Sequence, residues 1–121
     1  MDPWYSFGNA DMLDVAHMAV HTGHMTSPAA VKASFRAVTE NAARTFGLDG
    51  YGIAPGCHAD LVLLEARDAA EAVRMRANRL MVLRRGKSIA QTPPRTAKLS
   101  LAGRPDTLEP WRYAPVEASA P

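Results

Sequence analysis

The sequence of 121 residues predicts an α+β fold, in which two amphipathic helices precede three or four short strands with a small helix inserted among them. Apolar residues recur every three or four positions in the first 48 residues, which is the period of a helix packed on one face. Short apolar or alternating runs separated by Gly and Pro occupy residues 49–103, which is typical of strands and turns. Hydrophobic residues make up 47% of the chain, enough for one modest core.

The first helix is expected to begin after Asn9 or Ala10 and to run towards His24. Asn9 is an acceptable N-cap. Asp11 and Asp14 follow in the first turns, where the helix dipole favours negative charge. The residues predicted to form its apolar stripe are Met12, Val15, Ala16, Ala19 and Val20.

The second helix has the strongest start signal, because Ser27 can cap it and Pro28 suits its first position. Gly47 is expected to end it in a left-handed conformation. Its apolar positions are Val31, Phe35, Val38, Ala42 and Phe46, and its exposed positions are expected to be Lys32, Arg36, Glu40 and Arg44.

The second half begins with a Gly- and Pro-rich connecting loop over residues 49–60, followed by the apolar strand LVLLE at 61–65. Asp68 and Glu71 resemble a capping box for a short helix that runs through about Met75.

The stretch RLMVLRRGKSIAQ, residues 79–91, predicts a hairpin that turns at 85–87. TAKLSLAG, residues 96–103, alternates polar and apolar positions as a strand with one wet face should. Four prolines in the tail at 104–121 predict an irregular segment. The sheet of this half is expected to have open edges.

Composition excludes several functional classes. Fourteen Lys and Arg against 12 Asp and Glu give a net charge of +2, too small to indicate nucleic-acid binding, and the arginines of residues 74–85 are interpreted as a solvated face. The single Cys57 excludes an internal disulfide and suggests a reducing compartment. Neither a signal peptide nor a membrane-length apolar run is visible, so a cytoplasmic protein without a membrane partner is expected.

Three histidines, His17, His21 and His24, share one face of the first helix at i, i+4 and i+7. Imidazoles at i and i+4 can bind a metal, but the Glu of a His-Glu-x-x-His motif is missing. Packing, or capping of free carbonyls near the helix end, is the favoured interpretation.

Other candidate groups have plain structural explanations. Adjacent Cys57 and His58 point apart on an extended loop, and nothing nearby orients the imidazole, so nucleophilic catalysis is not favoured. Asp11 and Asp14 suit a helix start. Asp60 stands at a strand entrance, where its carboxylate can accept N–H groups of the preceding turn.

The opening Asp2-Pro3-Trp4 is harder to explain structurally. Pro3 restricts the backbone there, and Trp4 has a flat face on which a planar ligand can stack. From the residue alone, a core position for Trp4 remains the favoured alternative.

Three stretches resemble the C-terminal region of the amidohydrolase superfamily: NAARTFGL at 41–48, GIAPGCHADLVLLE at 52–65 and VLRRGKSIA at 82–90. The opening, DPWYSFGNADMLDVAHMAVH, narrows the resemblance further. The opening is similar to the bacterial cytosine deaminase family, with its Asp-Pro-Trp-Tyr, Met-Leu and His-Met-x-x-His. Order and spacing match as well, and the resemblance covers nearly all of the chain up to the proline-rich tail.

This resemblance implies a (β/α)8 barrel with a β-sandwich beside it, and a divalent metal, iron or zinc, that activates water for attack on the ring carbon bearing the amino group. The family's metal ligands and its catalytic Glu and His have no counterpart here, so we expect no catalytic residue and no bound metal in this chain. The resemblance places Trp4 near the pyrimidine, with Asp2 and Pro3 supporting its loop. It places His17 and His21 on a helix after the last barrel strand.

We therefore expect the last quarter or so of a cytosine-deaminase-like enzyme, inactive by itself, from a parent that is a homo-oligomer acting on a small heterocycle. Residues 1–48 would end the barrel, 49–103 would supply sandwich strands with a small inserted helix, and 104–121 would form the tail. The alternatives are a parent acting on another heterocycle, such as a triazine or an isocytosine-like ring, and a non-catalytic subunit or remnant that completes a separately encoded barrel.

Overall fold

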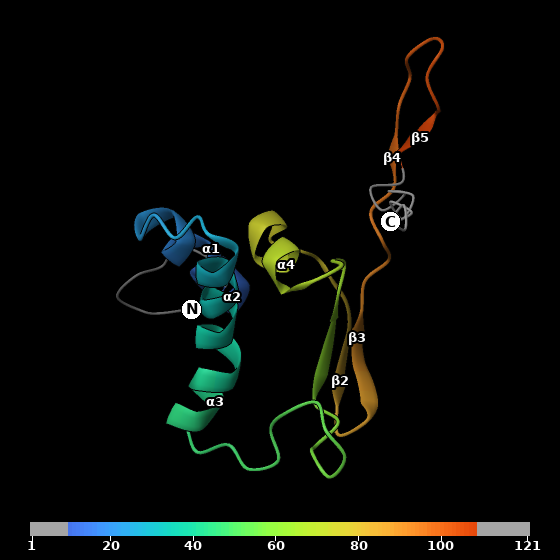
Figure 1. Cartoon of the computed structure of the whole chain (residues 1–121). Coiled ribbons are helices and arrows are strands. Elements are labelled where there is room, and N and C mark those ends of the chain that lie inside the picture. The colour runs from blue at the N-terminus through green and yellow to red at the C-terminus, as the bar shows by residue number, and fades with distance from the viewer. Residues whose placement is uncertain (1–9, 109–121) are drawn as a thin grey trace, which may run out of the picture.

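The structure, a computed structural model, describes residues 10–108 and has an α+β architecture, as the sequence predicts (Figure 1). Figure 1 shows α4 between the other helices and the sheet. In chain order the elements are α1 (Met12–Thr22), α2 (Pro28–Arg36), the π-helical η1 (Ala37–Asn41), α3 (Ala42–Thr45), β1 (Leu61–Leu64), α4 (Ala69–Met75), β2 (Arg79–Arg84), β3 (Lys87–Gln91), β4 (Ala97–Lys98) and β5 (Thr107–Leu108).

The hydrophobic core is small and lies where α1, α2 and α4 meet. Ser34 of α2 crosses this junction, because its buried hydroxyl donates to the carbonyl of Ala16 in α1 at 2.8 Å. Alanines dominate the core and let the helices approach closely. The buried cluster comprises Leu13, Ala16, Ala72, Val73 and Ala77, with Val20, Val31, Phe35, Val38, Leu64 and Ala66 packed partly against it.

The first helix differs from the prediction in its cap and in its buried face. Asp11 is the N-cap, since its carboxylate accepts the N–H of Leu13 at 2.8 Å, whereas Asn9 lies outside the described residues. Leu13 is buried, but the predicted stripe residues Met12 and Val15 are 50% and 52% exposed. The helix is apolar on two sides, so periodicity alone could not show which side meets α2 and α4.

The second helix begins as predicted, with the Ser27 hydroxyl accepting the N–H of Ala30 and Pro28 at the first position. It continues through η1 and α3, so the predicted single helix contains a π-helical segment. Gly47 follows with a φ of 60°, which confirms the left-handed end. Phe46 was wrongly placed on the packed face, since it is 76% exposed. The four charged residues predicted to be exposed are exposed.

The capping box of α4 is only half formed. Asp68 is the N-cap, because its carboxylate accepts the N–H of Glu71 at 2.8 Å. The Glu71 carboxylate, however, reaches the N–H and the guanidinium of Arg67 rather than the N–H of Asp68. The Arg67 contacts hold the pKa of Glu71 below its ordinary value. Glu71, at the third helical position, thus also holds Arg67, the residue that precedes the N-cap.

The three-stranded sheet has the antiparallel order β1-β2-β3. The predicted hairpin is confirmed, because β2 and β3 are joined by Arg85 and Gly86, with φ of 50° and 77°. Two consecutive positive φ values in a two-residue loop are the mark of a type I′ turn, whose twist suits a hairpin. Both β1 and β3 are edge strands of this sheet, as expected.

The strand predicted over residues 96–103 is far shorter in the structure. Only β4 is extended and paired, and its partner is β5 from the segment predicted to be irregular. Figure 1 shows this ribbon extending away from the sheet. Alternation alone did not produce a longer strand, because among the described residues its partner β5 is only two residues long.

None of the helices in residues 10–108 combines the length and the apolar character that crossing a bilayer requires.

Candidate functional site

The loop singled out by the sequence analysis, Asp2-Pro3-Trp4, lies outside the described residues. The described chain begins at Ala10, directly before the N-cap of α1. Ala10 has a φ of 60°, a left-handed conformation that costs a residue other than glycine roughly 1–2 kcal/mol. Such strain persists only where neighbouring contacts hold it. Ala10 is therefore held in a constrained conformation directly before α1.

Asp11 supplies these contacts at the start of α1. Besides capping the helix, its carboxylate forms a bidentate ion pair with the guanidinium of Arg79, the first residue of β2. Hydrogen bonding from Arg79 holds the pKa of Asp11 below its ordinary value, although partial burial opposes this, and the same contact raises the pKa of Arg79. The helix-start role of Asp11 is visible in the sequence, whereas its partner Arg79 is not, because it lies 68 residues away.

His17 and His21 interact with each other and with α4. His17 Nδ1 lies 3.0 Å from the carbonyl oxygen of Val73, and His21 Nε2 lies 3.1 Å from His17 Nε2. The two rings meet edge to face with centroids 4.4 Å apart. His17 thus has the packing role that the sequence favours, whereas His21 contacts an imidazole rather than a free carbonyl of α1. His24 is exposed in the turn after α1.

Cys57 and His58 fold back onto glycines of their own loop. The N–H of His58 donates to the carbonyl of Gly50 at 2.8 Å, and a Cβ on Gly50 would lie 2.8 Å from the His58 ring. Cys57 is half-buried, with its sulfur 3.3 Å from the place where a Cβ of Gly52 would stand. Both side chains thus lie close to glycines of their own loop, and this position agrees with the structural interpretation of the pair.

Asp60 has a structural task, but not the predicted one. Its carboxylate accepts the N–H of Arg85 at 2.6 Å and pairs with the guanidinium of Arg84, so it binds the hairpin turn rather than the preceding turn. The Arg85 N–H, followed by the nearby arginine charges, holds the pKa of Asp60 below its ordinary value. Arg74 also faces a carboxylate, that of Glu71 at 3.7 Å. These pairs leave the arginine-rich stretch partly neutralised, which does not favour nucleic-acid binding.

The described residues do not fit the divalent metal that the family resemblance implies. Within residues 10–108, no three His, Cys, Asp or Glu side chains gather closely enough to hold a metal ion. A catalytic zinc site ordinarily takes three protein ligands and keeps a fourth position for water.

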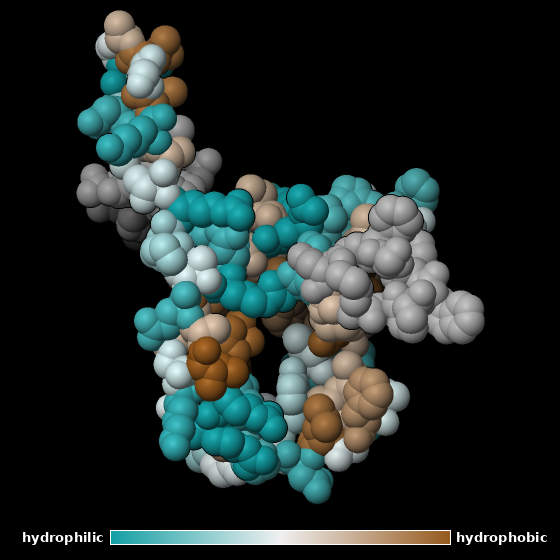
Figure 2. All heavy atoms as spheres, turned by 180° about the vertical axis from the view of Figure 1, so that it is seen from behind, coloured by the Kyte–Doolittle hydropathy of each residue, from teal (hydrophilic) through white to brown (hydrophobic). Residues whose placement is uncertain are grey.

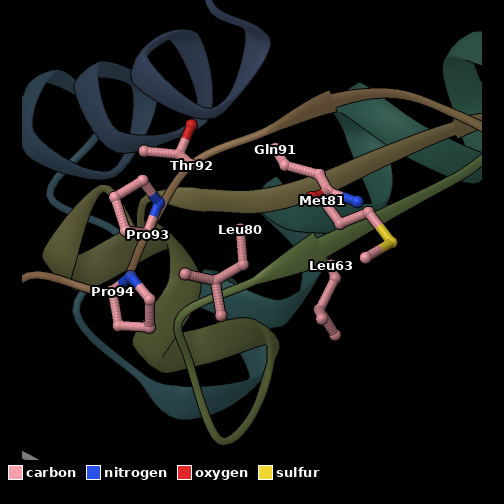
Figure 3. A pocket seen from close by; sticks show the side chains of 7 residues that line it. All are labelled: Leu63, Leu80, Met81, Gln91, Thr92, Pro93 and Pro94. Atoms are coloured by element: carbon pink, nitrogen blue, oxygen red, sulfur yellow. The ribbon is translucent and has the colours of Figure 1, made fainter.

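An open groove of about 490 Å³ lies along the sheet (Figure 3). Its side chains come from β1, β2 and the end of β3, together with the segment that follows β3. They carry no titratable group, so the groove has no acid, base or nucleophile of its own. The lining residues are Leu63, Leu80, Met81, Gln91, Thr92, Pro93 and Pro94.

Comparison with known families gives a match over residues 1–90 to the amidohydrolase family described as Amidohydro_3. The chain belongs to the amidohydrolase family. This match spans α1 to α4 and most of the three-stranded sheet, together with the opening loop.

Two relatives support the assignment of this chain to the amidohydrolase family. A pterin deaminase from Rhizobium rhizogenes is 37% identical over 94 residues, which are 77% of this chain and 21% of that protein. An N-isopropylammelide isopropyl amidohydrolase from Pseudomonas is 31% identical over 91 residues, 74% of this chain and 23% of the other. The chain thus spans between a fifth and a quarter of the length of these relatives.

Solved structures of amidohydrolases agree with the fold described for this chain. The 5-methylcytosine deaminase of Klebsiella pneumoniae, liganded with 5-fluorocytosine, matches with a TM-score of 0.72 and 38% identity, over 78% of this chain and 23% of that one. The N-isopropylammelide isopropylaminohydrolase of Burkholderia multivorans matches with a TM-score of 0.70 and 38% identity, over 74% of this chain and 23% of that one.

Proposed function

We propose that the chain is the C-terminal part of a metal-dependent amidohydrolase that hydrolytically deaminates cytosine or a similar aminopyrimidine. In the parent enzyme, residues 1–48 end a (β/α)8 barrel, residues 49–103 contribute strands to a β-sandwich, and residues 104–121 follow as a tail whose first part pairs with β4. The parent is a cytoplasmic homo-oligomer. By itself the chain is inactive, because the iron or zinc ion and its ligands belong to the part of the enzyme that precedes residue 1.

The carrying observation is the likeness to 5-methylcytosine deaminase, which joins 38% identity to a TM-score of 0.72 over 78% of this chain. Similarity to only 23% of that protein supports the proposal that this chain is one part of an enzyme. Residues 10–108 also bring no three metal-binding side chains together, so they do not form a metal-dependent active site by themselves.

Within the parent, Trp4 is the substrate-binding residue contributed by this chain. An indole ring stacked on a base contributes about 1–3 kcal/mol and tolerates many planar rings. Asp2 and Pro3 support the loop of Trp4. The ion pair between Asp11 and Arg79 anchors the point at which this loop meets α1.

Two alternatives rest on specific observations. The relatives include a pterin deaminase and an N-isopropylammelide hydrolase, so the parent substrate is alternatively another heterocycle, such as a triazine or an isocytosine-like ring. The short share of each relative that is matched also suits a non-catalytic subunit or remnant that completes a separately encoded barrel.

The DNA upstream of the codon for Met1 tests the proposal most directly. We expect it to encode His-x-His and a ligand Asp in the same frame or in a shifted one. A neighbouring gene for an amidohydrolase without its C-terminal part would instead establish the split-subunit alternative. Upstream DNA that encodes neither would contradict the proposed parent.

A graft tests the role of Trp4. The whole chain would replace the matching C-terminal part of the Klebsiella pneumoniae 5-methylcytosine deaminase, and ammonia release would be followed with cytosine, 5-methylcytosine and a triazine. We expect activity in the graft, none in the chain alone, and a KM raised about tenfold or more by Trp4→Ala. Trp111→Ala, in the tail, is the matched control. An unchanged KM in Trp4→Ala would remove that residue from the substrate site.

A further inference from the structure

Two imidazole nitrogens converge on one side of α1 without being part of the proposed active site. His17 Nε2 and His21 Nε2 lie 3.1 Å apart, on residues one helical turn from each other. His21 is exposed and His17 is half-buried, so the pair is open to solvent on one side. Nothing in the proposed deaminase chemistry uses either ring.

The contact with α4 determines which nitrogen of His17 carries its proton. A backbone carbonyl can only accept, so His17 Nδ1 must donate to the oxygen of Val73, 3.0 Å away. In the neutral ring, Nε2 is then left with a lone pair directed towards His21. A ring nitrogen fixed in this way by a backbone carbonyl is the usual outer contact of a metal-binding histidine, because it orients the ring and raises its basicity.

The spacing of the two nitrogens suits a metal ion. With metal–nitrogen bonds of about 2.05 Å, a separation of 3.1 Å corresponds to an angle of about 98° at the metal. This angle lies between the ~90° of octahedral or square-planar sites and the ~109° of a tetrahedral site. At present this contact is a hydrogen bond in which His21 Nε2 donates to His17 Nε2, and a metal ion would replace it. His21 would move its ring proton to Nδ1, which its exposed position allows through water, and both rings would rotate so that their lone pairs meet at the ion.

We propose that His17 and His21 form a two-imidazole site for a divalent transition-metal ion of the kind that imidazole favours, such as Ni²⁺, Cu²⁺ or Zn²⁺. This exchangeable site is separate from the catalytic metal of the parent enzyme, and it departs from the sequence-based expectation that this chain binds no metal. Water fills the remaining coordination positions, because among residues 10–108 no third His, Cys, Asp or Glu completes a cluster. With only two protein donors, the ion exchanges readily and is lost in the presence of a chelator. Bound metal bridges two turns of α1 and strengthens, through His17, the contact between α1 and α4.

Calorimetric titration of the untagged chain with NiCl₂ and ZnCl₂ tests the site, with thermal unfolding followed in parallel. We expect saturable binding of one ion per chain and a melting temperature that rises with metal concentration, because the ion binds the folded helix better than the unfolded chain. His21→Ala should weaken binding at least about tenfold and abolish the rise in melting temperature, since the chelate becomes a single imidazole. His21 is exposed, so this variant should still fold.

His24→Ala is the matched control, since it removes an exposed imidazole from the same region, and its binding constant should change by less than about twofold. Cys57→Ser should leave binding intact as well. The proposal is overturned if His21→Ala binds metal as tightly as the unsubstituted chain does. It is also overturned if His24→Ala weakens binding as much as His21→Ala does, or if Cys57→Ser abolishes binding. His17→Gln should also weaken metal binding. Because the amide of the glutamine can still donate to the Val73 carbonyl, this variant separates loss of the metal ligand from loss of the contact with α4.

Discussion

The helical half and the sheet half of this molecule differ in how much of themselves they bury. Every fully buried apolar residue of the described chain lies in a helix or directly after α4. By contrast, no residue of β1, β2 or β3 reaches full burial, and β3 is exposed along its whole length. Figure 2 shows apolar groups in brown standing between hydrophilic groups on the surface.

The difference shows that secondary structure and a packed core need not arise together. The sheet is paired along its strands, with one register shift in each strand pair, and it has a well-formed turn. Among residues 10–108, however, no second sheet packs against it. Val62, Leu63 and Ile89 are 50%, 55% and 64% exposed. Under the proposed function, the rest of the parent enzyme would cover this apolar surface.

The largest expected effect compares the same truncation in the two halves. Leu13→Ala should lower the free energy of unfolding by about 2–4 kcal/mol, because Leu13 is 5% exposed and its loss leaves a cavity between helices. Leu63→Ala should change it by less than about 0.5 kcal/mol, because Leu63 already meets water. Urea unfolding followed by circular dichroism measures both. Equal losses would mean that the sheet is packed as firmly as the helices.

Breaking the ion pair between Asp11 and Arg79, which joins the two halves, should have the next largest effect on the free energy of unfolding. Asp11→Ala removes the N-cap of α1, which is worth about 1 kcal/mol, together with the partner of Arg79. Asp11→Asn keeps a capping oxygen and loses the charge, so it should cost less. A double-mutant cycle with Arg79→Ala, read by urea unfolding, isolates the pair. Additive effects would show that the contact does not couple α1 to β2.

Acid should weaken the same connection. The pKa of Asp11 is lower in the folded chain than its ordinary value of 3.8, so its contribution is complete above that pH and is lost as the pH falls through the folded value. Asp60 and Glu71 shift in the same direction, so only part of the acid sensitivity depends on Asp11. As the pH is lowered, the free energy of unfolding should therefore begin to fall at the same pH in Asp11→Asn, but it should fall less steeply than in the unsubstituted chain. Superimposable acid profiles would contradict this.

The smallest expected effect concerns the exposed sheet. Ile89→Lys should reduce concentration-dependent self-association in analytical ultracentrifugation, because it replaces the large exposed apolar residue of an edge strand by a charge without touching the core. Ser88→Lys adds the same charge at the neighbouring exposed position and keeps Ile89. If both variants reduce association equally, charge repulsion rather than apolar surface is responsible.

Local signals predicted most of the element boundaries. Ser27 and Pro28 begin α2, Gly47 ends the helical segment, and Arg85-Gly86 turns the hairpin, because each depends on the backbone preferences of a few neighbouring residues. The candidate site was only partly accessible in this way. Trp4 was singled out by its motif and by resemblance, and it remains a prediction, since it lies outside the described residues.

The sequence by itself determined the order of helices and strands, the main caps and turns, and the family, because these depend on short-range chemistry and on motifs. Tertiary structure alone decided that Leu13 rather than Met12 faces the core, that Arg79 holds Asp11, and that His17 donates to Val73. It also decided that residues 96–103 form only a short strand. Each of these depends on partners distant in sequence, and an apolar or charged residue does not by itself specify which partner it meets.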